Sequence, residues 1–159
     1  MVKVLEETIA DLSELATKKN IFLVLQKPPA AVPLLSLDKS RLQQIYVNLI
    51  GNAVHYTETG GVTVSVENQG NALKILFRDT GIGIDLEDQS HLFKKFSTGK
   101  AFLHSREYGS GLGLYIGNLL TNMMGGSLKL ERSEVGTGSV FSLTFPIISP
   151  TSLKEKSAK

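Results

Sequence analysis

The middle of the chain contains two neighbouring runs in which apolar and polar residues alternate. The apolar positions of these runs are Val62, Val64, Val66, Leu73, Ile75 and Phe77. Strict alternation places such side chains on one face of a strand, and the Asn-Gln-Gly-Asn stretch between the runs is rich in turn formers. The two runs therefore predict a β-hairpin with one apolar face, which helices elsewhere in the chain must cover.

Three other segments have apolar residues at helical spacing. The first helix is predicted from residue 2 to about residue 18, and the second from Lys39 to about Tyr56, with Asp38 as its N-cap. A third helix begins near residue 112 and stops at Gly125 and Gly126. Its predicted apolar face comprises Leu112, Ile116, Leu119, Leu120 and Met123. These helices supply the cover that the hairpin requires.

Three further strands complete the predicted fold. Residues 21–25 form an unbroken apolar run, which predicts a buried strand, and residues 127–131 and 139–146 predict a final hairpin. Residues 85–96 are typical of a short helix and turn. This order of elements favours a two-layer α/β (α+β) sandwich. Its sheet is mixed and mostly antiparallel, with about five strands covered on one face by about three helices.

The composition limits the classes of protein to which the chain can belong. With 159 residues we expect one domain, at residues 1–148, followed by a disordered Lys- and Ser-rich tail at 149–159. A net charge of +2 provides no strongly basic surface, so we expect no nucleic-acid partner. No apolar run approaches the roughly 20 residues needed to cross a bilayer, so we expect no membrane contact. The absence of cysteine agrees with a reducing, cytoplasmic location.

The second predicted helix carries polar residues beside its apolar face. The apolar stripe comprises Leu42, Ile45, Leu49 and Ala53. Asn48, Asn52 and His55 form a second stripe along its edge, and Tyr56 lies where the two meet. Neutral amide and imidazole groups bind a hard cation or phosphate oxygens without the repulsion that a carboxylate would add. The helix alone equally allows a second interpretation, in which the asparagines cap local backbone groups or face water.

A glycine-rich loop, Asp-Thr-Gly-Ile-Gly-Ile at residues 79–84, directly follows the second strand of the hairpin. Asp79 would stand at the end of that strand, where its carboxylate can accept a hydrogen bond from an exocyclic amine. Gly81 and Gly83 would let the backbone approach a flat ring closely. Taken alone, the loop favours a simpler interpretation, a tight turn closed by an Asx hydrogen bond.

A second glycine-rich segment, Gly-Ser-Gly-Leu-Gly-Leu at residues 109–114, opens the third predicted helix. Backbone amides freed at a helix N-terminus form a binding site for phosphate. The spacing matches neither the dinucleotide-binding motif nor the P-loop, and an ordinary glycine-rich helix start is the alternative. Residues 97–110 lack periodicity and are long for a plain connection, which indicates a functional lid or a mobile loop.

In this order, the three segments resemble the catalytic ATP-binding domain of sensor histidine kinases, within the superfamily that includes gyrase and mismatch-repair ATPases. The resemblance covers roughly residues 2–146 and implies the Bergerat-type ATP-binding fold. Residues 42–57 look like the N box of that family, 79–84 like its first glycine box and 92–96 like its F box. Residues 109–114 look like the second glycine box, and 136–139 resemble the short last one.

The resemblance implies ATP and Mg²⁺ as ligands. Asn48 and Asn52 would hold the magnesium ion and the phosphates, Asp79 would bind the adenine amine, and Thr137 would assist through water. Residues 97–110 would be the ATP lid. Phe93 and Phe96 would pack beneath it, while Lys94, Lys95, Lys100 and Arg106 would either add positive charge near the phosphates or be solvated. The implied nucleotide-binding set is Asn48, Asn52, His55, Tyr56, Asp79, Gly81, Gly83, Ile84, Lys95, Gly109, Ser110, Gly111, Leu112, Gly113, Leu114 and Thr137.

The chain departs from the family at two places. The family usually has lysine at the position of His55, and a neutral imidazole there would weaken phosphate binding or make it depend on pH. The lid sequence is also idiosyncratic, so no cation in it is assigned to the phosphates.

The phosphoacceptor histidine of the family lies on a separate dimerisation domain, and none of the three histidines here has its sequence context. We therefore expect no catalytic nucleophile in this chain and little activity alone. The implied partners are the phosphoacceptor domain of the same parent protein and, indirectly, a response regulator. The domain itself is expected to be a monomer.

Other functions remain open at this point. An ATPase of the gyrase or chaperone sort would place a glutamate where this helix has Asn48, and no acidic residue occurs between Arg41 and Thr57. A degenerate kinase that senses nucleotide, or a serine kinase acting on an anti-sigma partner, is also compatible with the motifs.

Overall fold

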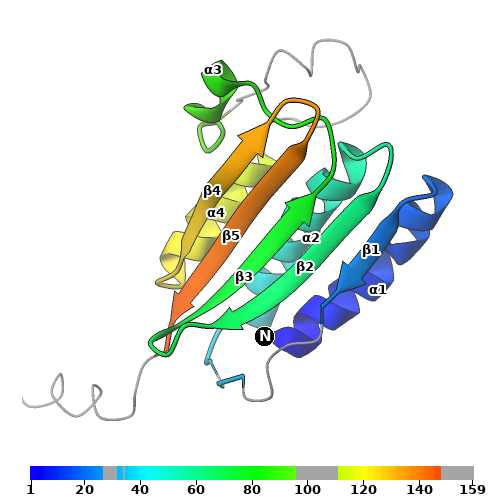
Figure 1. The fold of residues 1–159 in the computed structure, drawn as a ribbon. Coiled ribbons are helices and arrows are strands. Elements are labelled where there is room, and N and C mark those ends of the chain that lie inside the picture. The colour runs from blue at the N-terminus through cyan, green and yellow to red at the C-terminus, as the bar shows by residue number, and fades with distance from the viewer. Residues whose placement is uncertain (27–31, 34, 96–110, 148–159) are drawn as a thin grey trace, which may run out of the picture.

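The computed structural model describes residues 1–26, 32–33, 35–95 and 111–147, which form a five-stranded sheet and four helices (Figure 1). The elements in chain order are α1 (Val2–Lys18), β1 (Phe22–Leu25), α2 (Lys39–His55), β2 (Gly61–Asn68), β3 (Ala72–Asp79), α3 (Leu86–Gln89), α4 (Gly113–Met123), β4 (Ser127–Glu134) and β5 (Gly138–Pro146). The predicted helix bounds at α1 and α2 are confirmed. Asp38 caps α2 as predicted, because its Oδ1 accepts a hydrogen bond from the Arg41 amide at 3.0 Å.

The sheet has the strand order β1-β2-β3-β5-β4. β1 runs parallel to β2, and the other neighbouring pairs are antiparallel. Figure 1 shows α1, α2 and α4 together on one face of the sheet, while the other face is open. The predicted two-layer α/β sandwich with a mixed, mostly antiparallel sheet is thus confirmed.

The hydrophobic core lies between the sheet and the three long helices. The register aligns Val64 with Phe77 and Phe77 with Phe141, so the predicted apolar face of the hairpin continues across β5. Tyr46 of α2 reaches this layer, with its ring centroid 6.1 Å from that of Phe77. The opposite faces of the same strands carry polar residues, as expected of an antiparallel sheet with one solvated face.

The prediction of a buried first strand was wrong. β1 is an edge strand, in which the side chains of Phe22 and Val24 are 47% and 43% exposed. Leu23 and Leu25 pack against the core instead. An unbroken apolar run reads as buried on both faces, but helices cover only one face of this sheet, so alternate residues of β1 remain in contact with solvent.

The predicted apolar face of α4 was also partly wrong. Leu119 and Met123 are 47% and 59% exposed, whereas Gly117 and Thr121 are buried. Gly117 lies against Leu128 of β4, where an added β-carbon would be 3.7 Å from the leucine side chain. The helix approaches the sheet through its small residues, which a count of apolar positions cannot reveal.

The tail predicted at 149–159 lies outside the described residues, so its disorder stays a prediction. Within the described part of the chain, the structure has no helix long and apolar enough to cross a membrane.

Candidate nucleotide site

The polar edge of α2 lies against the start of α4. Asn48 Nδ2 donates a hydrogen bond to the carbonyl oxygen of Gly113, 3.2 Å away, although the two residues are 65 positions apart. Asn52 is about one helical turn further along α2 and is partly exposed. The fold therefore brings the polar edge of α2 together with the glycine-rich segment that opens α4. The contact also shows that Asn48 takes part in tertiary packing, beyond the local capping role that the helix alone allowed.

The C-terminus of α2 is held by a lysine from another helix. Lys19, the C-cap residue of α1, donates hydrogen bonds from Nζ to the carbonyl oxygens of Val54 and His55, at 3.0 and 2.6 Å. Burial, and next the positive charge of Lys19, lower the pKa of His55 below its usual value. This shift favours the neutral imidazole that the sequence predicts at this position.

Tyr56 joins α2 to the first glycine-rich loop. Its ring contacts the His55 ring edge to face, with 4.7 Å between centroids, and burial raises the pKa of Tyr56 to about 12. Its carbonyl oxygen accepts a hydrogen bond from the Ile82 amide at 3.1 Å. Two predicted site segments therefore meet at Tyr56.

Asp79 stands at the end of β3, as predicted, and is only 8% exposed. Its Oδ1 accepts hydrogen bonds from the amides of Gly81 and Ser139, at 2.9 and 3.1 Å. The Asx hydrogen bond that the loop alone favoured is thus present, but it accounts for only part of the environment. Burial raises the pKa of Asp79, while the two backbone hydrogen bonds oppose the rise. A buried carboxylate at a strand end is the type of group that binds an exocyclic amine.

Glycines allow the loop after β3 to lie directly on the turn between β4 and β5. Gly83 has φ +71°, and an added β-carbon would overlap the carbonyl oxygen of Glu134. The Gly136 amide donates to the Ile82 carbonyl oxygen at 2.8 Å, and the Ile84 amide donates to Ser133 Oγ at 2.8 Å. The loop conformation is therefore set by a turn that comes about 50 residues later in the chain.

Thr137 lies in the turn between β4 and β5, and its role in nucleotide binding stays a prediction. It is exposed, and its amide donates to the Glu134 carbonyl oxygen within the turn. Ser139, two residues later, is buried, and its amide donates to Asp79 Oδ1. Arg78 pairs with Val140 in the sheet, so Ser139 comes next to Asp79 at the end of the ladder. An alignment of the two predicted strands could have identified Ser139, but their register was not available from the sequence.

The second glycine-rich segment is described from Gly111 onward. Gly111 has φ +65°, Leu112 precedes the helix, and Gly113 is its first residue. Leu114 packs against the core, so its side chain serves the fold. Gly109, Ser110, Phe96, Lys100 and Arg106 lie outside the described residues, as does the rest of the predicted lid at 97–110.

One of the predicted cations lies close to this helix start. The Lys95 ammonium is 5.3 Å from the centroid of the Tyr115 ring, in the first turn of α4, which is the distance of a cation–π contact. Lys94 instead contacts His91, with 2.8 Å between Nζ and Nδ1. Phe93 packs against the core, in agreement with the packing role implied for it.

The residues available for a metal ion are amides. Among the described residues, no group of three or more histidines, cysteines or acidic residues could hold a metal by itself. Asn48 and Asn52 offer neutral side-chain oxygens about one turn apart on α2. Such a pair fits Mg²⁺ when phosphate oxygens and water supply the other ligands.

Comparison with known proteins identifies the family. The model described as "Histidine kinase-, DNA gyrase B-, and HSP90-like ATPase" matches residues 37–149. The chain belongs to this family of ATPases. Signal transduction histidine-protein kinase BarA of Escherichia coli is 42% identical over 109 residues, 65% of this chain and 12% of that protein. Sensor histidine kinase RcsC of Escherichia coli is 34% identical over 145 residues, 91% of this chain and 15% of that protein. The chain thus spans a small part of these relatives.

Solved structures support the same assignment within the ATPase family. The catalytic domain of histidine kinase ThkA, in a nucleotide-free form, has a TM-score of 0.76 and 25% identity, covering 91% of this chain and 92% of that one. Full-length ShkA in complex with AMPPNP has a TM-score of 0.76 and 29% identity, covering 93% of this chain and 31% of that one. The chain therefore has the fold of histidine kinase catalytic domains and belongs to an ATP-binding family.

Proposed function

We propose that this domain binds Mg-ATP and donates the γ-phosphoryl group to a histidine on a separate dimerisation and phosphoacceptor domain of the same parent protein. The observation that carries the proposal is the hydrogen bond from Asn48 to Gly113. It holds the amide-bearing edge of α2 against the N-terminus of α4, so two kinds of phosphate-binding group lie together.

The end of the site that receives the adenine base is formed by Asp79 and the glycine-rich loop at residues 79–84. The Asp79 carboxylate, already oriented by the Gly81 and Ser139 amides, accepts a hydrogen bond from the adenine amine. Gly83 keeps the loop against the turn after β4, so its backbone forms a fixed wall beside the ring. Tyr56 and Ile84 line the same region.

The phosphate end is formed by α2 and α4. Asn48 and Asn52 would hold the magnesium ion through their side-chain oxygens, and the amides of Gly111 to Gly113 would meet the phosphates. When bound, magnesium neutralises phosphate charge and orients the oxygens for transfer. Lys95 adds a positive charge near the first turn of α4, whereas neutral His55 contributes only a dipole. Gly109, Ser110 and the lid would complete this end.

Phosphoryl transfer requires mainly positioning and charge neutralisation, so a domain without its own nucleophile can supply most of the catalysis. We propose a cytoplasmic monomer that acts on the phosphoacceptor domain and, through it, on a response regulator. The names of the relatives support the kinase part of this proposal, since BarA and RcsC are named histidine kinases and two Dictyostelium discoideum relatives are named hybrid signal transduction histidine kinases.

Two alternatives differ in measurable ways. Hydrolysis without an acceptor is disfavoured because α2 offers no carboxylate near Asn48 to activate water. The feature that favours a degenerate, nucleotide-sensing domain is His55, which stands where the family usually has a lysine. Steady phosphate release by the isolated domain would support the first alternative, and tight ATP binding without transfer would support the second.

The test of the binding site is calorimetric titration with Mg-ATP and Mg-ADP. We expect Asp79→Asn and Asn52→Ala each to weaken binding by roughly tenfold or more, since each removes a directional polar contact. Asp11→Asn on α1 and Asn122→Ala on α4 are matched controls at exposed positions. Tight binding that neither site variant alters would contradict the assignment of the site.

The test of transfer uses the phosphoacceptor domain of a relative together with radiolabelled ATP. We expect acid-labile, base-stable label on that domain, and none when its histidine is replaced. If ATP binds normally but no acceptor becomes labelled, the kinase assignment is wrong and the nucleotide-sensing alternative stands.

A further inference from the structure

Strand β4 contains a one-residue register shift. Leu130 pairs with Phe141 of β5, but the next pair is Arg132 with Val140, so Glu131 is an extra residue. In a regular strand, Leu130 and residue 132 would face the same side of the sheet. The shift instead places Arg132 opposite Val140, on the open face. β-Bulges of this kind redirect the side chains that follow them.

The residue redirected towards the site is Ser133. After the shift it pairs with Ser139, and the two hydroxyl oxygens are 2.8 Å apart. Ser133 Oγ also accepts the hydrogen bond from the Ile84 amide at 2.8 Å and lies 3.2 Å from the Gly138 carbonyl oxygen. One hydroxyl group of β4 therefore contacts both the loop after β3 and the start of β5.

The two residues that Ser133 holds are those that shape the base end of the site. The Ser139 amide donates to Asp79 Oδ1 at 3.1 Å, so the position of Ser139 helps to set the direction of the carboxylate. Ile84 is the last residue of the glycine-rich loop, which forms the proposed wall beside the adenine ring. Gln89 of α3 adds a further link, because its side-chain nitrogen donates to the Ile84 carbonyl oxygen at 2.9 Å.

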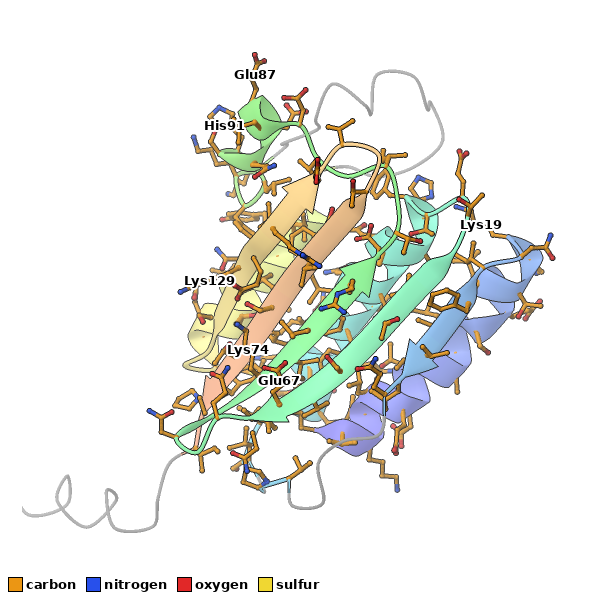
Figure 2. All side chains as sticks on the ribbon, viewed as in Figure 1. Lys19, Glu67, Lys74, Glu87, His91 and Lys129 are labelled. Carbon is orange, nitrogen blue, oxygen red and sulfur yellow. The ribbon has the colours of Figure 1, made fainter. Side chains whose placement is uncertain are left out.

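The bulge is stabilised on the opposite face of the sheet. Glu131 Oε1 accepts a hydrogen bond from Ser142 Oγ at 2.6 Å and lies 2.8 Å from Lys74 Nζ. Figure 2 shows Lys74 and Lys129 on this open face, away from the helices. The extra residue is thus fixed by β3 and β5 together, and the reversal of direction after it is built into the sheet.

We infer that Ser133 is a positioning residue for nucleotide recognition, brought to the site by the bulge at Glu131. It makes no proposed contact with the nucleotide itself. It acts through Ser139, which orients the Asp79 carboxylate, and through Ile84, which fixes the loop. The inference rests on the proposed function, and it adds that selectivity for an amine-bearing base depends on a hydroxyl group outside the predicted motifs.

The test compares Mg-ADP with Mg-IDP, in which a carbonyl replaces the adenine amine. We expect the wild-type domain to prefer ADP, because Asp79 accepts a hydrogen bond from an amine and repels a carbonyl oxygen. In Ser133→Ala, the affinity for ADP should fall by about tenfold and the ratio of ADP to IDP affinity should fall with it. Ser133→Thr, which retains a hydroxyl, should keep most of that ratio.

Two further measurements separate positioning from a general loss of stability. The Ile84 amide in the nucleotide-free protein should exchange with solvent faster in Ser133→Ala, by roughly tenfold, because it loses its acceptor. Ser65→Ala, a matched change on the open face of β2, should alter neither exchange nor base preference. Thermal unfolding checks that each variant is folded.

The outcomes distinguish the two levels of the argument. If wild type binds ADP with clear preference and Ser133→Ala retains the same preference, the inference about Ser133 is wrong while the proposed function stands. Equal loss of preference in the alanine and threonine variants would also overturn it. If wild type binds neither nucleotide, the proposed function fails, and the inference fails with it.

Discussion

Lys19 Nζ lies 2.6 Å from the carbonyl oxygen of His55, so the residue that follows α1 caps the C-terminus of α2. Figure 2 shows Lys19 at this end of α1, beside the start of β1. The carbonyl groups at a helix C-terminus carry partial negative charge, and an ammonium group there stabilises the helix. The same contact fixes the segment that leads to Tyr56 and the glycine-rich loop.

Lys19→Met should destabilise the domain by about 1–2 kcal/mol, because it removes two hydrogen bonds and a favourable charge at the helix end. The pKa of His55 should rise, since the Lys19 charge helps to lower it. Urea unfolding and an NMR titration of His55 would measure the two effects. Lys18→Met is the matched control, because Lys18 forms an exposed ion pair with Glu14. Equal destabilisation by both changes would contradict the capping role.

His55 should make folding depend on pH below neutrality. Its pKa in the folded state is lower than its ordinary value of about 6.5, so the unfolded state binds more protons in that range. The contribution of His55 to stability is therefore complete above the unfolded-state pKa of about 6.5, and it is lost as the pH falls through the lower folded-state pKa. Unfolding free energies between pH 5 and 8 should show this slope in wild type and lose it in His55→Gln.

Asp79→Asn should increase stability at pH 7 even though it weakens nucleotide binding. Burial raises the folded-state pKa of Asp79, so the stability that wild type has at low pH is lost as the pH rises through that pKa. Asparagine carries no charge and retains an oxygen acceptor. The difference in unfolding free energy between variant and wild type should therefore be largest at pH 7 and vanish below about pH 3.8. A variant that is less stable than wild type at pH 7 would show that the carboxylate is structurally required.

Gly83→Ala should disrupt the site, whereas Gly136→Ala should have only a backbone effect. Both residues have positive φ, at +71° and +78°, which costs an alanine about 1–2 kcal/mol. Only at Gly83 would the new methyl group overlap the backbone of Glu134, while at Gly136 it would meet open space. We expect loss of nucleotide binding and a larger fall in melting temperature in Gly83→Ala alone. Similar effects of the two changes would contradict the close contact between loop and turn.

Tyr46→Phe should either stabilise the domain, by up to about 1 kcal/mol, or leave its stability unchanged. Tyr46 is fully buried beside Phe77, and among the described residues its hydroxyl group has no hydrogen-bond partner. Removing an unsatisfied buried hydroxyl relieves its desolvation cost and leaves the ring packing in place. Urea unfolding would measure this, with Tyr115→Phe as a control at a partly exposed position. A loss of more than about 1 kcal/mol would show that the hydroxyl is satisfied, for instance by buried water.

Local signals were enough for most of the fold. The hairpin at β2 and β3, the helix that Asp38 caps, and the strand end at Asp79 each depend on residues within a few positions of one another, so periodicity and turn chemistry predict them. The same signals placed Asn48 on the edge of a core helix and gave His55 a neutral role. The chemical types in the site were therefore predictable from the sequence.

Contacts between distant segments decided the rest. Whether Phe22 is exposed depends on which face of the sheet the helices cover, and whether Leu119 is exposed depends on where Gly117 meets β4. Ser139 contacts Asp79, and Ser133 contacts Ser139, because of the register between the strands. Side chains in a strand alternate, so a shift of one residue reverses the face of every side chain that follows it. The sequence by itself determined the elements and their chemistry; the tertiary structure decided which residues meet, because strand register and helix packing are set by segments far apart in the chain.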